Sequence, residues 1–239
     1  MQSKNKKVEN NTYLLIFMST EQKPKNLAVV EVISKSEQFI EKNQKIILIV
    51  IAAILILVGG YFGYKKLYAE PRQETAASEM FAAEQYFKNE DMDKALNGDG
   101  KHLGFLAIID KYGSTKSGKL ANFYAGSAYL TKGEYNKAID YLEDFKVKDV
   151  FLSSQAKAMI GDCYMELNKT NDAIKYYEKA IVDANDMTTP FVLLKLGLAY
   201  EISKDNKKAL ESYKRIKTEF PASTEGREID KYITRLENL

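Results

Sequence analysis

The side chains that could do chemistry in this 239-residue chain are few and lie far apart in the sequence. There is one histidine, His102, and one cysteine, Cys163. Zinc-protease chemistry requires two histidines one helical turn apart, so this sequence excludes it. A nucleophile–base pair would have to use His102, but no G-x-S-x-G turn and no cysteine stands near it. We therefore interpret His102 as a solvated loop residue and predict that the chain is not an enzyme.

Three glycines next to this histidine, Gly98, Gly100 and Gly104, have a spacing distantly similar to that of a dinucleotide-binding loop. In that motif the loop follows a β-strand, because the strand end and the next helix together hold the pyrophosphate. In this chain a helical repeat precedes the glycines. We therefore predict that the chain has no cofactor.

Aspartates before and within the same segment suggest a calcium loop at first sight. An EF-hand loop that began at Asp91 would need glycine at the position of Leu96 and glutamate at that of His102, so the pattern fails. We predict no metal site. The segment Asn97–Gly104 is better interpreted as an ordered turn at the edge of a helical stack.

Composition limits the possible partners. The chain has 35 Lys and Arg against 33 Asp and Glu, and no basic stripe dominates any segment, which argues against nucleic-acid binding. A single cysteine permits no intrachain disulfide and is compatible with either redox compartment. Cys163 lies within a helical pattern, so we expect it to be a buried small hydrophobe. We also predict no small-molecule substrate.

The first element along the chain is one long apolar segment. Residues 46–64 carry no charge, Lys45 precedes them, and Lys65 and Lys66 follow. At a rise of about 1.5 Å per residue the segment is about 28 Å long, close to the thickness of a bilayer's hydrocarbon core. Its Ile, Leu and Val side chains favour insertion by about 3–7 kcal/mol in total. These features predict a transmembrane helix over residues 46–64.

Two other interpretations of this segment fit less well. A buried core helix would keep a polar stripe, whereas this segment is apolar on every side. A cleavable signal peptide has a shorter apolar region and a small-residue cleavage site, and residues 1–45 would precede it. A retained signal anchor fits better. Tyr61, Phe62, Tyr64 and Tyr68 are typical of an aromatic belt at the membrane surface.

Small residues and flanking charges say more about this span. Gly59, Gly60 and Gly63 would let a second membrane helix approach closely, so we predict that they form a helix–helix contact in the membrane.

Residues 1–45 contain eight Lys and five Glu, and the rest of the chain has 27 basic and 28 acidic residues. By the positive-inside rule this difference slightly favours a cytoplasmic N-terminus.

The residues before the span divide into two segments. Residues 1–26 are predicted to be a disordered tail, in which Met18 is an alternative translation start to Met1. Residues 27–45 have apolar side chains at helical spacing, which predicts an amphipathic juxtamembrane segment. A mobile tail is the alternative interpretation of residues 27–45.

After the span the sequence repeats itself. A small residue, a Tyr three positions later and an Ala twelve positions later recur in three copies, which begin at Gly126, Gly161 and Gly197. The small residue lets the two helices of a pair approach closely, and the Tyr one turn later fills the gap beside it. The Ala gives the second helix its matching close contact. We therefore expect a series of helix pairs.

Both ends of this array differ from its middle. A fourth copy begins at Ala83 and carries roughly eight extra residues, which fall in Asn97–Gly104 before an apolar helix, Phe105–Tyr112. At the other end Ser223 can cap a final helix whose apolar face includes Leu239. An open repeat stack requires such a capping helix.

Helix pairs of about 34 residues with these offsets resemble the tetratricopeptide repeat family, although the Trp usual near the start of the first helix is absent. The resemblance implies a tetratricopeptide-type helical solenoid. With the N-terminal single transmembrane helix and the C-terminal capping helix predicted above, this gives an all-α fold. The repeat domain is expected over residues 71–239. Its repeats are expected at about 76–116, 117–150, 153–186 and 190–221, with a cap at 223–239.

The resemblance also implies a binding surface, because the first helix of each repeat lines a concave groove in this family. The predicted partner-binding residues are the large apolar side chains at the groove positions: Leu120, Phe123, Leu130, Met165, Phe191, Leu194 and Leu198. An exposed apolar groove of this kind binds an extended or helical segment. The alternative is that neighbouring elements cover these side chains.

The order of tail, span and repeats is similar to that of YfgM-like ancillary subunits of the bacterial SecYEG translocon, as are the segments Glu37–Lys45 and Tyr61–Lys66. This resemblance implies a bacterial inner-membrane protein, with a cytoplasmic N-terminus and a periplasmic repeat domain. It implies a scaffold whose protein partners are translocon subunits, periplasmic chaperones or secreted chains. An adaptor in a cell-envelope or outer-membrane assembly complex is the alternative.

Overall fold

The computed structural model describes residues 25–181 and 185–239, with side chains from residue 37 onward. The alternative start Met18 and nearly all of the predicted tail lie outside the described residues. The described part is helical, and its only β-type pairing is an isolated bridge. The prediction of an all-α fold is confirmed. The chain forms two units, residues 1–64 and 65–239.

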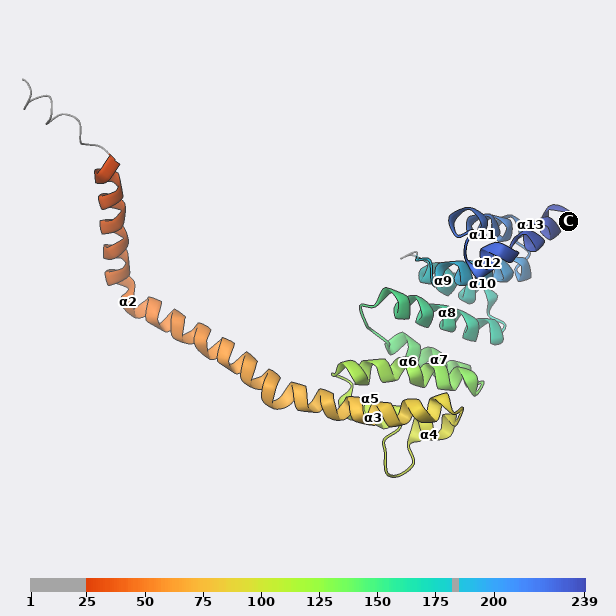
Figure 1. The fold of residues 1–239 in the computed structure, drawn as a ribbon, viewed down its shortest axis with the longest axis horizontal. Coiled ribbons are helices and arrows are strands. Elements are labelled where there is room, and N and C mark those ends of the chain that lie inside the picture. The colour runs from red at the N-terminus through yellow and green to blue at the C-terminus, as the bar shows by residue number, and fades with distance from the viewer. Residues whose placement is uncertain (1–24, 182–184) are drawn as a thin grey trace, which may run out of the picture. The chain divides into compact units, whose positions relative to one another are not determined.

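The described part of the first unit is one helix, α2 (Lys25–Tyr64), drawn in red and orange in Figure 1. The most apolar stretch of this helix is not covered by any other part of the described chain, and Leu57, for example, is 72% exposed. Leaving apolar surface in water costs about 25 cal/mol per Å², so this helix needs an apolar environment. One helical stretch of the described chain, Glu37–Lys88, is long and apolar enough to cross a membrane. This is compatible with a single-pass anchor.

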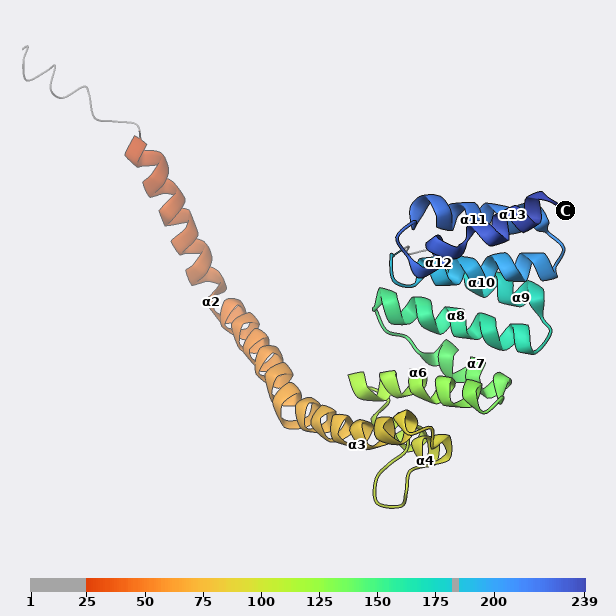
Figure 2. The ribbon, with the colours of Figure 1, turned by 45° about the vertical axis from the view of Figure 1, so that its right-hand side comes forward.

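The second unit is a stack of helix pairs that follow one another in chain order (Figures 1 and 2). A π-helical segment, η1 (Lys65–Ala69), leads into the first pair. The helices are α3 (Glu70–Lys88), α4 (Met92–Asn97), α5 (Phe105–Tyr112), α6 (Lys116–Thr131), α7 (Tyr135–Asp144), α8 (Val150–Glu166), α9 (Thr170–Ala180), α10 (Thr189–Ile202), α11 (Asn206–Glu219), α12 (Thr224–Glu228) and α13 (Asp230–Glu237). The pairs are α3 with α4 and α5, then α6–α7, α8–α9 and α10–α11, and the last two helices cover the final pair.

Three of these pairs are closed by a glycine of the first helix that faces a large side chain of the second. The contacts are Gly126 with Leu142, Gly161 with Tyr177 and Gly197 with Tyr213. A Cβ added at Gly197 would lie 2.2 Å from Cε1 of Tyr213, and one at Gly161 would lie 2.5 Å from Cε1 of Tyr177. These distances are far shorter than a van der Waals contact, so only glycine fits at the anchor.

The turn between the helices of each pair also repeats. Seven residues after each anchor the backbone takes a left-handed conformation, at Glu90 (φ 60°), Gly133 (φ 74°), Asn168 (φ 57°) and Lys204 (φ 64°). A left-handed residue at this place ends a helix and turns the chain back. Only one of the four is glycine, and the left-handed conformation costs other residues about 1–2 kcal/mol. The turn is therefore regular in structure although its sequence is not.

The first pair differs because its second helix is interrupted. α5 spans Phe105–Tyr112, as the sequence predicts, whereas α4 extends to Asn97, the first residue of the predicted insertion. The residues between them form a turn that is closed by an antiparallel bridge between Gly98 and Leu103. The interpretation of this insertion as an ordered turn is confirmed.

Asp99 holds the inserted turn in shape. Its carboxylate accepts hydrogen bonds from the backbone N–H of His102 at 2.6 Å and of Lys101 at 2.9 Å, and from the Tyr86 hydroxyl at 2.8 Å. The bond from His102, followed by those from Tyr86 and Lys101, keeps the pKa of Asp99 well below its ordinary value. The aspartate that suggested a calcium ligand is therefore a structural acceptor of N–H and O–H groups.

Cys163 lies in the last turn of α8, with none of its surface exposed. Burial, with a smaller contribution from the Asp162 carboxylate, raises the pKa of the Cys163 thiol to about 12. The thiol is therefore neutral at ordinary pH and packs as an apolar group, which confirms the interpretation from the sequence.

The cap begins as predicted and ends differently. The Ser223 hydroxyl accepts a hydrogen bond from the Gly226 N–H at 2.8 Å. The buried side chains of the cap are Ile229, Ile233 and Leu236. Leu239 was expected on the same apolar face, but it is 86% exposed, because α13 already ends at Glu237. The prediction was wrong for Leu239.

Gly197→Ala is expected to lower the free energy of unfolding of the repeat unit by about 1–3 kcal/mol, because the new methyl group overlaps the Tyr213 ring. Chemical denaturation of the full-length protein in detergent, followed by circular dichroism, measures this change. Gly59→Ala is the matched control, since a Cβ at Gly59 meets no atom within 4 Å. Equal stability of the two variants would contradict the close contact at the anchor.

The single cysteine provides a second test of the fold. Because burial raises the pKa of the Cys163 thiol to about 12, the native protein contains on the order of a hundredfold to a thousandfold less thiolate than the unfolded chain at mildly alkaline pH. We expect a thiol reagent to modify Cys163 at least that much more slowly in the native protein than in denaturant. An exposed cysteine introduced by Ser114→Cys should react rapidly in both. Rapid native modification of Cys163 would place it at the surface.

Candidate functional site

The predicted groove residues lie on α6, α8 and α10, the first helices of three successive pairs. Two of them, Leu130 and Met165, are brought together at one hollow of about 330 Å³. The residues that line this hollow are Leu130, Tyr135, Asp162, Met165, Glu166 and Lys195. The hollow crosses from one pair to the next, as expected for a groove along a stack.

Two further predicted residues are exposed on α10. Phe191 is 47% exposed and Leu198 is 37% exposed, and Ile202, one turn after Leu198, is 61% exposed. Their spacing places the three side chains on neighbouring positions of one helix surface. We call Phe191, Leu198 and Ile202 the α10 stripe. Sequence reasoning missed Ile202, although its helical spacing from Leu198 was a sufficient signal.

The remaining predicted residues belong more to the core. Leu120 and Leu194 are half-buried and pack against the two core clusters. Phe123 is a correction, because only 8% of it is exposed. The ring of Phe145, which follows α7, lies 5.4 Å from the ring of Phe123 and covers it. Phe123 therefore stabilises the stack and presents no free surface for a partner.

A carboxylate forms the polar centre of the hollow. Oδ1 of Asp162 accepts a hydrogen bond from the Tyr177 hydroxyl at 2.7 Å and is paired with Nζ of Lys195, also at 2.7 Å. Burial, followed by the nearby Asp162 carboxylate, raises the pKa of Tyr177 well above its ordinary value, so the hydroxyl remains a donor. Lys195 also lies over the Phe191 ring, 4.7 Å from its centroid. This lysine therefore joins the hollow to the α10 stripe.

A second carboxylate lies at the rim. Oε2 of Glu166 accepts a hydrogen bond from the Tyr135 hydroxyl at 3.2 Å, and Glu166 is exposed. Asp162 is neutralised by Lys195, whereas Glu166 has no ion pair within the described chain. The hollow therefore offers apolar side chains beside one free negative charge. Sequence reasoning missed Tyr135, Glu166 and Lys195, because none stands at a groove position of the family pattern.

His102 and Cys163, the histidine and the cysteine of the described chain, lie in different environments. His102 is exposed, and its Nδ1 lies 3.8 Å from Oε2 of Glu79. Cys163 is buried in the core of the stack, far along the chain from this histidine. Among the described residues, no group of three or more His, Cys, Asp and Glu is placed to hold a metal ion. The hollow is suited to binding and contains no nucleophile with a base beside it.

The predicted membrane contact, Gly59, Gly60 and Gly63, lies near the end of α2. A Cβ added at any of the three would meet no atom within 4 Å. This part of the helix surface is therefore open within the described chain, and its partner stays a prediction.

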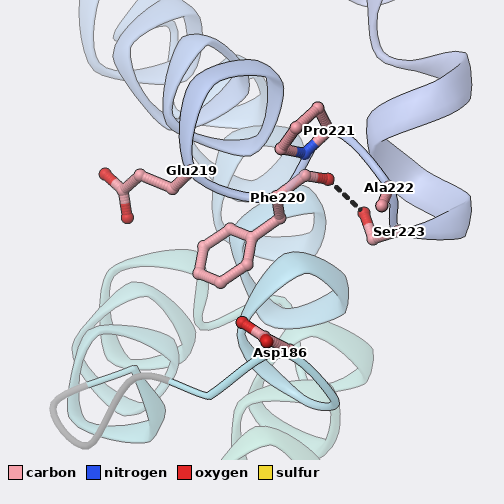
Figure 3. Close-up of a pocket in the computed structure, with 6 residues that line it drawn as sticks. All are labelled: Asp186, Glu219, Phe220, Pro221, Ala222 and Ser223. Atoms are coloured by element: carbon pink, nitrogen blue, oxygen red, sulfur yellow. Dashed lines mark hydrogen bonds between the residues drawn. The ribbon is translucent and has the colours of Figure 1, made fainter.

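A second hollow, of about 280 Å³, lies at the junction of α11 and α12 (Figure 3). It is lined by Asp186, Glu219, Phe220, Pro221, Ala222 and Ser223. The carbonyl of Phe220 accepts a hydrogen bond from the Ser223 hydroxyl at 2.9 Å, and this bond shapes the turn. The lining is mostly the turn itself, so we interpret this hollow as a feature of the junction.

Comparisons with known proteins agree with this geometry. Residues 121–145 and 154–181 match one family model described as Tetratricopeptide repeat, and residues 191–223 match another with the same description. The chain is 28% identical over 97 residues to "Lipopolysaccharide assembly protein B" of Escherichia coli (strain K12), which is 41% of this chain and 23% of that relative. The chain therefore matches less than a quarter of the length of this curated relative.

Solved structures match the fold over a longer range. The MamA protein aligns with a TM-score of 0.52 and 20% identity, over 69% of this chain and 89% of that one. A Podosopora anserina putative kinesin light chain with TPR-like repeats aligns with a TM-score of 0.51 and 14% identity, over 68% and 84%. At this identity the likeness concerns the fold alone. Residues 65–239 thus form a tetratricopeptide-type helical solenoid, with tetratricopeptide repeats confirmed within residues 121–223.

Proposed function

We propose that this chain is a membrane-anchored scaffold that binds other proteins. The observation that carries the proposal is an apolar helix without any protein cover, joined to a solenoid of repeats that offers an open hollow and an exposed apolar stripe. Anchoring confines this surface to the membrane and raises its effective concentration toward partners at the membrane. The proposed domains are those expected from the sequence, a tail (1–26), a juxtamembrane segment (27–45), a span (46–64) and a repeat domain (71–239).

The groove favours one kind of partner. The α10 stripe and the hollow present apolar side chains on the surface of successive first helices, and Glu166 adds a free negative charge. An amphipathic helix or extended segment with apolar anchors and a nearby Lys or Arg complements this surface. Leu120, Leu130, Met165 and Leu194 would widen the contact, because each is partly accessible.

The first candidate for the biological setting is an accessory of the protein secretion channel. Its support is the similarity of span and flanking segments to YfgM-like subunits of the SecYEG translocon. In that setting the protein lies in a bacterial inner membrane with a cytoplasmic N-terminus and a periplasmic repeat domain. Its partners are translocon subunits, periplasmic chaperones or secreted chains, and Gly59, Gly60 and Gly63 contact a channel helix.

The second candidate is an adaptor in envelope assembly. Its support is the similarity of 97 residues to a protein named for lipopolysaccharide assembly. In this setting the repeats would bind assembly proteins at the membrane, and the span would serve only as an anchor. The two candidates therefore differ in what they require of the span.

Exchange of the transmembrane span distinguishes the two candidates. We expect that replacing Ile46–Tyr64 with an unrelated transmembrane helix lowers co-purification with the secretion channel strongly, because a replaced helix loses the small-residue contact. The measurement is affinity purification from detergent-solubilised membranes with quantitative mass spectrometry. The exchanged protein must still be found in the membrane fraction. Undiminished recovery of the channel would contradict the first candidate, and unchanged recovery of assembly proteins would support the second.

The groove itself is tested at the α10 stripe. Phe191→Glu combined with Leu198→Glu should weaken partner capture by at least about 30-fold, because two charges would enter the apolar contact. Partner capture is measured as the yield of photo-crosslinked product, with a photo-crosslinking residue in place of Met165 in the full-length protein in membranes. Phe81→Glu is the matched control, because Phe81 is 64% exposed on α3 outside the groove. Equal loss with Phe81→Glu, or no loss with the stripe variant, would contradict binding at this groove.

A further inference from the structure

Charge is unevenly distributed over the second unit. The start of α3 and the junction between α5 and α6, residues 65–74 and 110–119, contain six Lys and Arg against three Asp and Glu. The rest of residues 65–239 contains 21 Lys and Arg against 25 Asp and Glu. A positive region therefore lies where the chain leaves the apolar span, on a module that is otherwise negative.

The structure joins these two stretches of sequence. Nε2 of Gln73 donates a hydrogen bond to Oγ of Ser117 at 2.8 Å, and the Lys116 N–H donates one to Oε1 of Gln73 at 2.8 Å. The Arg72 guanidinium donates a hydrogen bond to the carbonyl of Lys111. The first turns of α3 are thus fixed against the α5–α6 junction.

Aromatic rings strengthen this connection. Arg72 lies over the ring of Tyr112, 5.3 Å from its centroid, and over that of Tyr68 at 5.6 Å. Stacked in this way, the guanidinium holds η1 and α5 together. Its charge is directed toward the rings and a carbonyl, so the free positive charge of the region comes from the lysines.

Five lysines of this region are exposed, and none forms an ion pair within the residues that the structure describes. They are Lys65, Lys66, Lys111, Lys116 and Lys119, and we call them the basic edge. Lys116 and Lys119 lie in the first turns of α6. A cation there is unfavourable, because the helix N-terminus carries a partial positive charge. These lysines therefore do not serve the stability of their own helix.

Apolar side chains accompany the basic edge. Leu67, next to Lys66 in η1, is 82% exposed. Figures 1 and 2 both place the starts of α6 and α8 along the side of the stack on which α3 begins. At the start of α8, Val150 and Phe151 are also exposed. Exposed apolar groups in the same region as unpaired lysines are typical of proteins that lie on anionic membranes.

We propose that the basic edge docks on the anionic phospholipid headgroups of the membrane that holds the span. The partner is a lipid surface, because Lys65 directly follows the uncharged segment and Arg72 lies only about 10 Å further along a helix. Lys65 and Lys66 therefore lie within about one Debye length of the headgroups, and Arg72 and Gln73 join them to the α5–α6 junction that carries the other three lysines. Docking fixes the orientation of the first helix pairs and is independent of whatever protein the groove binds.

The test uses the full-length protein in nanodiscs of pure phosphatidylcholine or of phosphatidylcholine with phosphatidylglycerol. A fluorophore on Ser114→Cys, in the α5–α6 junction, reports contact with lipids that carry a quencher on their headgroup. The same fluorophore on Asn136→Cys, at the start of α7, is the comparison site. The unmutated chain, labelled in the same way, measures any background signal from a fluorophore on Cys163. We expect stronger quenching at position 114 with phosphatidylglycerol than without it, and a loss of this difference at high salt.

Charge reversal at the basic edge completes the test. Lys116→Glu with Lys119→Glu should lower the ratio of docked to undocked protein by at least about 25-fold. Each lysine near an anionic surface favours docking by about 1 kcal/mol, or about fivefold, and two lysines are lost. This variant retains its fold, because glutamates suit a helix N-terminus better than lysines do. Lys101→Glu with Lys207→Glu, two exposed lysines elsewhere, should leave quenching unchanged. Equal quenching in both lipids, or an equal effect of both variants, would overturn the proposal.

Discussion

Close approach between the two helices of a pair is the constraint on which the rest of the repeat unit depends. Glycine at the anchor lets the ring of Tyr177 or Tyr213 pack directly on the backbone of the first helix. Each tyrosine hydroxyl then reaches a carboxylate of that helix, Asp162 at 2.7 Å and Glu201 at 2.5 Å. The contact that closes the pair therefore also fixes an acidic group on the helix expected to line the groove. Packing and groove polarity are consequences of one arrangement.

The first pair lacks both the glycine anchor and the large side chain that faces it, and these two differences occur together. Its anchor is Ala83, which is fully buried, so a methyl group is tolerated there. The position sixteen residues later is Asp99, which belongs to the inserted turn because α4 has already ended at Asn97. No second-helix residue therefore stands at the place that Leu142 or Tyr213 occupies in later pairs. The insertion and the loss of glycine at the anchor are thus connected.

The sequence predicted the helix pairs, the inserted turn and the burial of Cys163, because each follows from local spacing. It predicted Phe123 wrongly, since the covering ring of Phe145 comes from the end of the next helix, whose position no spacing rule gives. Lys195 was missed for a similar reason, because its partner Asp162 lies on another pair. Local periodicity thus identifies which residues share a helix face. Contacts between pairs require the three-dimensional stack.

Two surfaces of the solenoid could act at the same time. The basic edge belongs to η1, α5 and α6, whereas the α10 stripe belongs to the last pair, and the pair α8–α9 separates them (Figure 2). Five residues separate Tyr64 from α3, so the chain itself lets α3 begin no more than about 20 Å from the end of the span. The basic edge and the α10 stripe have no residue in common. A module held through its first pairs would leave the stripe accessible, so membrane docking and partner binding need not compete.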